Sequence, residues 1–247
     1  MTSELLLRLS VILVGFIIVG TAACLPLYRW NVRDLLASSL FVKILWWIPI
    51  FLVLILILYG GLTVAIAVTA VVILLGLREF IRNRGWSQRF ASLYFILFLI
   101  WTAHLAWWYT LPESLATPLL IAVAVMSVVS DVCAFFFGNY LGHHNLPHWL
   151  NRRKSWEGVA GQIIGAGIGA LLAIFFLSIP LSLGLILAIG VASASGDLIN
   201  SAAKRSLSIR DWGRTIPGHG GVMDRMSSLS LSITVAYWTT FAFYIMQ

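Results

Sequence analysis

Residues 48–77 read IPIFLVLILILYGGLTVAIAVTAVVILLGL, and none of these side chains is charged. A helix needs about 20 predominantly apolar residues to cross the hydrocarbon core of a bilayer. With its flanking residues the stretch is long enough for two crossings, and Gly60-Gly61 near its middle predicts a tight turn between them. We therefore expect one membrane span over 40–58 and another over 61–77.

The rest of the chain has the same character. Of its 247 residues, 60% are hydrophobic and only 10% are charged, and the mean hydropathy is +0.96. A soluble domain carries about 25% charged residues, so this chain has too few to cover a surface that faces water. The composition predicts an all-α, polytopic membrane helix bundle of about eight transmembrane helices. We place them near 5–26, 40–58, 61–77, 91–110, 117–137, 160–178, 181–201 and 222–245.

The 16 Lys and Arg residues predict the orientation of the bundle. All except Arg8 fall in or beside four connections between spans, at 29–43, 78–89, 152–154 and 204–225. Short basic loops stay on the cytoplasmic side of a membrane. We therefore expect these four connections to face the cytoplasm and both termini to lie on the opposite side. The net charge of +7 follows from this topology, so it does not indicate a nucleic-acid partner.

Two acidic residues, Asp131 and Asp197, fall inside or at the edge of apolar runs. A charged side chain at the centre of a membrane helix costs about 2.5–3.5 kcal/mol on insertion scales. Such a residue faces a polar cavity, a partner or an ion. The alternative is a structural salt bridge or a buried hydrogen bond, and Lys204 and Arg205 are near enough in sequence to Asp197 to be its salt-bridge partners.

The segment 201–225 carries the most chemistry. It combines five cations, two carboxylates and one histidine, and three of its glycines stand around one Pro-Gly turn. Glycines let backbone N–H groups approach a ligand, and such groups form anion-binding nests. Cations neutralise phosphate, and Mg²⁺ prefers a few carboxylates together with substrate phosphate. The pattern predicts a magnesium-phosphate site at the cytoplasmic surface. A basic loop with a Gly-rich turn would explain the cations but not the interleaved acids.

The spacing of these residues resembles the signature of the phosphatidate cytidylyltransferases (CDP-diacylglycerol synthases). Ser201, Lys204-Arg205, Arg210-Asp211, Pro217-Gly-His-Gly-Gly221 and Asp224-Arg225 stand at the spacings of that signature. Gly196-Asp197-Leu198, Asp131-x-x-Ala134 and Lys154-Ser-Trp-Glu-Gly158 also fit the family. The resemblance covers residues 125–230, whereas the first 110 residues match only as generic membrane spans.

Three positions depart from the family pattern. Arg210 replaces a lysine and keeps the charge, Asn200 stands where a glutamate is common, and Ser227 stands where the signature ends in aspartate. Losing that carboxylate lowers the negative charge near a metal and predicts weaker Mg²⁺ binding. These departures predict a slower or divergent member of the family, or one with a different lipid substrate.

The resemblance implies cytidylyl transfer from CTP to phosphatidate, giving CDP-diacylglycerol and pyrophosphate, with Mg²⁺ as cofactor and room for a second cation such as K⁺. The implied catalytic residues are Asp197, Lys204, Arg205, Asp211, His219, Asp224 and Arg225. The implied substrate-binding residues are Lys154, Glu157, Ser201, Arg210, Gly218, Gly220 and Gly221. The implied metal ligands are Asp131, Asp197, Asp211 and Asp224. His219, which lies between glycines, is expected to donate to phosphate or stabilise the turn more than to act as a base.

The family also implies a place and partners for the protein. We expect an integral protein of a bacterial inner (cell) membrane, forming a homodimer, with one integrated membrane domain. Residues 1–110 supply N-terminal helices, and 111–247 supply the catalytic helices with a cytoplasmic signature loop. Gly161, Gly165 and Gly169 recur every four residues, which favours close helix packing within or between subunits.

Three other functions are compatible with the sequence. The first is a related CTP-dependent enzyme that acts on another lipid phosphate or on a prenol. The second is a degenerate paralogue that serves as a partner or lipid-binding scaffold, which Ser227 favours. The third is a transporter that uses the intramembrane acids, but this leaves the 201–225 pattern without a purpose.

Overall fold

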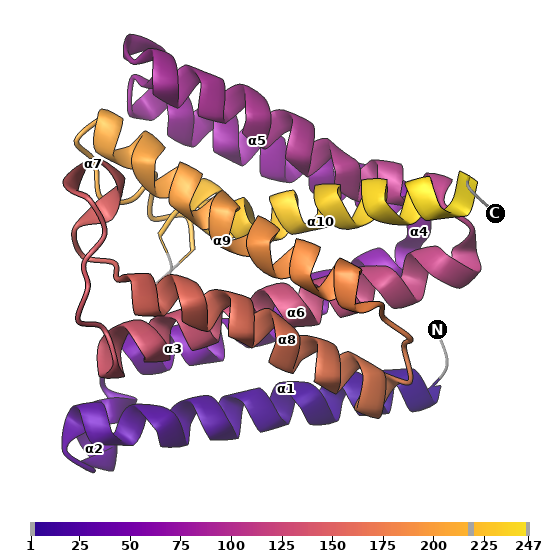
Figure 1. Cartoon of the computed structure of the whole chain (residues 1–247), viewed down its shortest axis with the longest axis horizontal. Coiled ribbons are helices and arrows are strands. Elements are labelled where there is room, and N and C mark those ends of the chain that lie inside the picture. Colours follow the sequence, from indigo (N-terminus) through magenta and orange to yellow (C-terminus); the bar gives the residue numbers. More distant parts are fainter. Residues whose placement is uncertain (1–2, 217–219, 246–247) are drawn as a thin grey trace.

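The computed structural model describes residues 3–216 and 220–245, and it is a bundle of roughly aligned helices (Figure 1). The α-helices are α1 (Ser3–Cys24), α2 (Val32–Leu36), α3 (Ser39–Leu45), α4 (Trp47–Arg82), α5 (Arg89–Trp107), α6 (Glu113–Tyr140), α7 (His148–Asn151), α8 (Trp156–Leu177), α9 (Leu183–Ser206) and α10 (Val222–Ile245). Short 3-10 turns follow α1, α4 and α5. The described residues form no strand, which confirms the all-α prediction.

Six segments of the described chain are long and apolar enough to cross a membrane. They are Ser3–Tyr28, Leu40–Arg82, Arg89–Thr110, Glu113–Tyr140, Trp156–Leu177 and Leu183–Ser206. The chain is therefore an integral membrane protein built from helices, as predicted. These six do not include α10, and the predicted number of about eight crossings stays a prediction.

The longest of these segments, Leu40–Arg82, is not one straight rod. A straight helix of its 43 residues would measure about 65 Å, roughly twice the hydrocarbon core. Gly61 breaks it with φ 62° and ψ −152°, a left-handed backbone that favours glycine. The Ile57 carbonyl accepts from the Tyr109 hydroxyl, 2.7 Å away, beyond the end of α5. Glu79 instead bonds to the start of α10, at the other end of α5. The chain thus turns back at Gly61, as the glycine pair predicted.

The basic connections gather at one end of the bundle. The Tyr140 hydroxyl joins the end of α6 to the Ala23 carbonyl near the end of α1, and Asn83 joins the end of α4 to the Trp212 carbonyl. In Figure 1, α2, α7 and the α9–α10 connection all lie on the left. Arg8, the one basic residue outside these connections, donates instead to the Phe176 carbonyl at the far end of α8. The predicted segregation of basic residues is present in the fold.

The glycine repeat of α8 packs within the chain, against α6. A side chain at Gly161 would meet Phe137, one at Gly165 would meet Cys133 and Val129, and one at Gly169 would meet the backbone of Met126. Small residues let helix backbones approach closely in membranes, where packing supplies much of the association energy. The α6–α8 contact holds Asp131 and Gln162 within hydrogen-bonding distance of each other.

Gly165→Ala is expected to lower the thermal stability of the detergent-purified protein. Its methyl group would lie 2.7 Å from Cys133 Cβ and 2.8 Å from the Val129 carbonyl oxygen, and such overpacking costs about 1–3 kcal/mol. Gly167→Ala is the matched control, because on the same helix a Cβ at Gly167 meets nothing within 4 Å. Equal unfolding midpoints for the two variants would contradict this account of the α6–α8 contact.

Candidate active site

The predicted site residues of the described chain come from α6, α8, α9, α10 and two connections at the basic end. The connection from α9 to α10 folds back over the helix ends, beside α4 (Figure 1). Its anchor is Trp212, whose side chain is buried and stacks on Tyr94 with ring centroids 5.9 Å apart. Burying a large aromatic ring fixes a loop at low entropic cost, because few torsions must be ordered.

Asp224, in the first turn of α10, accepts three hydrogen bonds. Its side chain is only 1% exposed and accepts from Lys204 Nζ at 2.6 Å. Its second oxygen accepts the backbone N–H groups of Trp212 at 2.8 Å and Gly221 at 2.9 Å. One carboxylate thus joins α9, the loop and α10.

Asp197 and Asp131 are two further acids of the site, and the Asp197 side chain is more exposed than that of Asp224. Asp197 on α9 makes an ion pair with Lys154, which comes from the α7–α8 connection. Asp131 on α6 accepts from Gln162 at 3.1 Å and from Ser228 at 3.0 Å. The two carboxylates are close enough for their charges to interact. Both acids have the polar partners that their position in apolar runs predicted.

The arginines of the signature divide into two kinds. Arg225 is exposed, and its charge acts on both Asp131 and Asp197. Arg205 turns toward the loop, where its Nη1 donates to the Ile209 carbonyl at 3.0 Å. Arg210 lies on the surface, with its Nε 3.7 Å from Asp211. Arg225 and Arg210 therefore keep groups open to an anion, whereas part of Arg205 holds the loop.

Two of the predicted glycines, Gly220 and Gly221, lie against Asp224. Gly220 has φ +90°, and a Cβ there would lie 3.0 Å from Asp224 Oδ2 and 3.6 Å from Asp211 Cβ. Gly221 donates its N–H to Asp224, so this group already has a partner and is not a free phosphate donor. Gly218 and His219 lie outside the described residues, and their predicted roles stay predictions.

Glu79 on α4 is a site residue that the sequence did not single out. It is 4% exposed, and its Oε1 accepts from the Thr215 hydroxyl at 2.5 Å and the Val222 N–H at 2.8 Å. Its Oε2 accepts from the Met223 N–H at 3.1 Å. The first N–H groups of a helix have no partner within it, and a negative charge there is favourable. Glu79 therefore caps α10 from a helix 143 residues earlier in the chain.

Close approach of Glu79 requires two of the glycines. A side chain at Gly213 would lie 2.8 Å from Glu79 Oε1, and one at Gly221 would collide with the same carboxylate. The absence of a side chain at Gly221 thus leaves room for the Glu79 carboxylate.

Two departures from the family pattern contact each other. Asn200 and Ser227 are both 1% exposed, and Asn200 Nδ2 donates to Ser227 Oγ at 3.3 Å. The Trp212 indole donates to Asn200 Oδ1 at 2.7 Å. An uncharged hydrogen-bonded pair therefore fills the place where the resemblance predicted two carboxylates.

Two predicted substrate-binding residues have other surroundings. Ser201 on α9 is buried. Glu157 at the start of α8 accepts from the backbone N–H of His144 at 3.1 Å and from its Nδ1 at 2.6 Å. Glu157 thus holds the α6–α7 connection, which sequence reasoning did not foresee.

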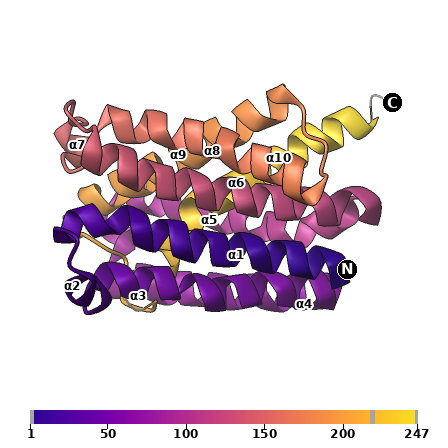
Figure 2. The ribbon, with the colours of Figure 1, turned by 90° about the horizontal axis from the view of Figure 1, so that it is seen from below.

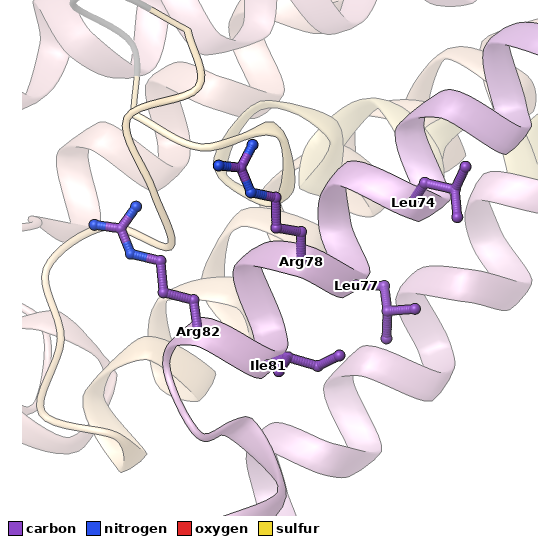
Figure 3. Close-up of a pocket in the computed structure, with 5 residues that line it drawn as sticks. All are labelled: Leu74, Leu77, Arg78, Ile81 and Arg82. Carbon is purple, nitrogen blue, oxygen red and sulfur yellow. The ribbon is translucent and has the colours of Figure 1, made fainter.

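Two further cations border the site on α4. Arg78 and Arg82 lie one turn apart, on either side of Glu79 in sequence, and Figure 3 shows their guanidinium groups on the same side of the helix. With Leu74, Leu77 and Ile81 they line a shallow surface hollow of about 460 Å³. They add positive potential at the basic end of the bundle.

The predicted metal ligands Asp131, Asp197, Asp211 and Asp224 do not form one centre here. Among the described residues no three His, Cys, Asp or Glu side chains converge as a metal site. Asp197 and Asp224 instead hold the ammonium groups of Lys154 and Lys204. Mg²⁺ commonly uses only one or two carboxylates with substrate phosphates, and the neighbouring pair Asp131 and Asp197 fits that smaller requirement.

Comparison with known proteins identifies the family. The profile described as the Cytidylyltransferase family matches residues 90–243. The phosphatidate cytidylyltransferase of Mycobacterium leprae (strain TN) is 40% identical over 124 residues, 49% of this chain and 38% of that protein. That of Mycobacterium bovis is 36% identical over 123 residues, 48% of this chain and 40% of that protein. That of Brucella suis biovar 1 is 30% identical over 231 residues, 91% of this chain and 83% of that protein. The matches thus span less than half of the mycobacterial relatives but most of the Brucella one, and the chain belongs to the cytidylyltransferase family.

Proposed function

We propose that this protein transfers the cytidylyl group of CTP to phosphatidate, giving CDP-diacylglycerol and pyrophosphate. The observation that carries the proposal is the meeting of Lys154, Asp197, Lys204, Asp224 and Arg225 at one end of a membrane bundle. Relatives named phosphatidate cytidylyltransferase support it. A site at the end of the helices lets CTP arrive from water while the acyl chains stay in lipid.

The reaction needs positioning and charge neutralisation more than a nucleophilic side chain. A phosphate oxygen of the lipid attacks the α-phosphorus of CTP, a new P–O bond forms, and the bond to pyrophosphate breaks. The nucleophile is already an anion, so no proton has to be removed from it. Lys204, Arg225 and Lys154 would hold the triphosphate and the lipid phosphate, as cations do in other phosphoryl transfers.

The acidic residues would hold Mg²⁺ with the substrates. Asp131 and Asp197 supply two neighbouring carboxylates, and Asp224 and Asp211 flank Gly220 nearby. The ion would neutralise phosphate charge and orient the triphosphate, and a second cation such as K⁺ remains part of the proposal. Lys154 and Lys204 would then leave their ion pairs with the carboxylates and bind the phosphates.

The proposal includes a topology. We infer eight crossings, because the chain turns back at Gly61 and α10 is 24 residues long. The basic end would face the cytoplasm of a bacterial cell membrane and both termini the opposite side. Residues 1–110 and 111–247 would form one integrated domain, and the homodimer stays a prediction.

Purified protein in phosphatidylcholine nanodiscs, supplied with labelled CTP and Mg²⁺, tests the function. Phosphatidate is expected to give labelled lipid and pyrophosphate in equal amounts, and chelation of Mg²⁺ is expected to stop both. A panel containing polyprenyl phosphate and a free prenol separates the main proposal from a related CTP-dependent enzyme. Product with another lipid and none with phosphatidate would refute the substrate assignment.

The Asn200–Ser227 contact favours one second candidate, a weakened or inactive paralogue that acts as a partner or lipid-binding scaffold. Ser227→Asp is expected to raise Mg²⁺-dependent turnover and to lower the Mg²⁺ concentration that gives half-maximal rate, because it restores a carboxylate beside Asn200. The control is Ser208→Asp, because Ser208 is exposed on the connection between α9 and α10. A buried serine such as Ser232 would not serve, since a carboxylate there would itself destabilise the fold. Absence of turnover in both the native chain and Ser227→Asp would favour the scaffold.

A further inference from the structure

A deep apolar cavity begins at the site and runs into the membrane-spanning part of the bundle. Its volume is about 330 Å³, within the range of about 300–1,000 Å³ that is usual for ligand sites. Residues of α1, α4, α6 and α10 line it. Figure 2 shows α1 running alongside α4 at the side of the bundle.

The cavity is long and has one polar end. Leu120, Ala124, Val128 and Asp131 line it from one face of α6, and the eleven steps from Leu120 to Asp131 rise about 17 Å along a helix. Arg225, Met226, Leu229 and Ile233 line it from α10. The charged residues Asp131 and Arg225 both belong to the site, whereas the remaining walls are almost entirely hydrocarbon.

We propose that this cavity holds one acyl chain of the lipid phosphate, with the phosphate next to Arg225. The proposal rests on the proposed function and names the part of its substrate that the N-terminal helices contact. A cation at the mouth of an apolar channel complements an anionic headgroup attached to a hydrocarbon tail. The Asp131 carboxylate at the same end would repel the lipid phosphate unless Lys154 or a metal ion neutralised the carboxylate. The phosphate would therefore lie next to Arg225 and away from Asp131.

The cavity would select and position the lipid more than increase its affinity. Moving a chain from the bilayer into the cavity exchanges one hydrocarbon environment for another, and the hydrophobic effect contributes little inside a membrane. A chain threaded between α1, α4 and α6 would instead fix where the phosphate stands relative to CTP. Position decides rate in a reaction between two bound substrates.

Filling the cavity tests this role. Ala124→Phe places a ring between the polar mouth and the apolar end, and it is expected to lower kcat/KM for dioleoyl phosphatidate about 10-fold or more. Turnover of dihexanoyl phosphatidate is expected to stay within about twofold, because six carbons need little of the channel. Ala70→Phe is the matched control, since Ala70 is exposed on α4 and does not line the cavity. Equal losses for both chain lengths, or no loss, would overturn the proposal.

A binding measurement separates this inference from the proposed function. Phosphatidate with a diazirine near the end of one acyl chain, irradiated in phosphatidylcholine nanodiscs, is expected to label peptides containing Phe16, Leu54 or Leu120, three lining residues. Unlabelled phosphatidate and Ala124→Phe should both reduce the labelling. Labelling without any CTP turnover would refute the function and keep the lipid site. Turnover without such labelling, or equal labelling by a phosphatidylcholine probe, would refute the site alone.

Discussion

Asp224→Asn is expected to lower CTP-dependent pyrophosphate release by at least about 100-fold, the usual effect of removing one well-placed charged group from a transition state. The same carboxylate fixes Lys204 and accepts two N–H groups of the loop. Its loss would therefore disturb both the charge balance and the position of the substrate-binding cations. Initial rates at saturating CTP and phosphatidate measure the effect.

Stability must be measured beside activity, because the pair is buried. Removing one partner of a buried ion pair costs about 3–5 kcal/mol, so Asp224→Asn should also lower the unfolding midpoint. The double variant Lys204→Gln with Asp224→Asn leaves no unpaired charge and is expected to recover part of that stability but none of the turnover. Asp34→Asn, on exposed α2, controls for the chemical change. Full activity in Asp224→Asn would remove this residue from the proposed site.

The sequence predicted the parts of the structure that depend on local pattern. Apolar length predicted the helices, Gly60-Gly61 predicted the reversal inside Leu40–Arg82, and the distribution of arginine predicted which connections share one end. Burial cost predicted that Asp131 and Asp197 would have polar partners, and both do. Each of these properties follows from a short stretch of chain and its solvent.

The pairing inside the site could not be predicted in the same way. Lys154 meets Asp197 across 43 residues and Asn200 meets Ser227 across 27, and nothing local to either residue specifies the other. Trp212 stands among charged loop residues, yet it is buried against Tyr94. The residue types alone do not specify which lysine pairs with which carboxylate, Lys154 with Asp197 and Lys204 with Asp224.

Glu79 is the clearest case, because it stands between Arg78 and Phe80 in a basic connection and looks like one charge among several. Its function appears only when α4 meets α10, where it satisfies two helix N–H groups and one hydroxyl. This contact ties the N-terminal helices to the signature loop. It implies that the first 110 residues do more than anchor the protein in the bilayer.

Glu79→Ala is expected to destabilise the protein by on the order of 3 kcal/mol, because it leaves buried N–H groups without an acceptor, and to reduce turnover strongly. If Glu79 acts by positioning the loop, the KM for CTP should rise, and trypsin should cleave faster after the exposed Arg210 and Arg214. The isosteric Glu79→Gln keeps an oxygen acceptor and should recover part of each property. Glu113→Gln, in the exposed first turn of α6 at the opposite end of the bundle, should change none of them.

These measurements distinguish positioning from a purely structural role. A helix cap that only stabilised α10 would lower the unfolding midpoint while the folded fraction kept its KM and its resistance to trypsin. A residue that holds the loop over the site must change both in the folded enzyme, because Thr215 and Val222, which stand before and after residues 217–219 in the chain, both donate to this carboxylate. If KM and the rate of proteolysis are unchanged in folded Glu79→Gln and Glu79→Ala, Glu79 contributes only to stability, and α4 does not position the loop.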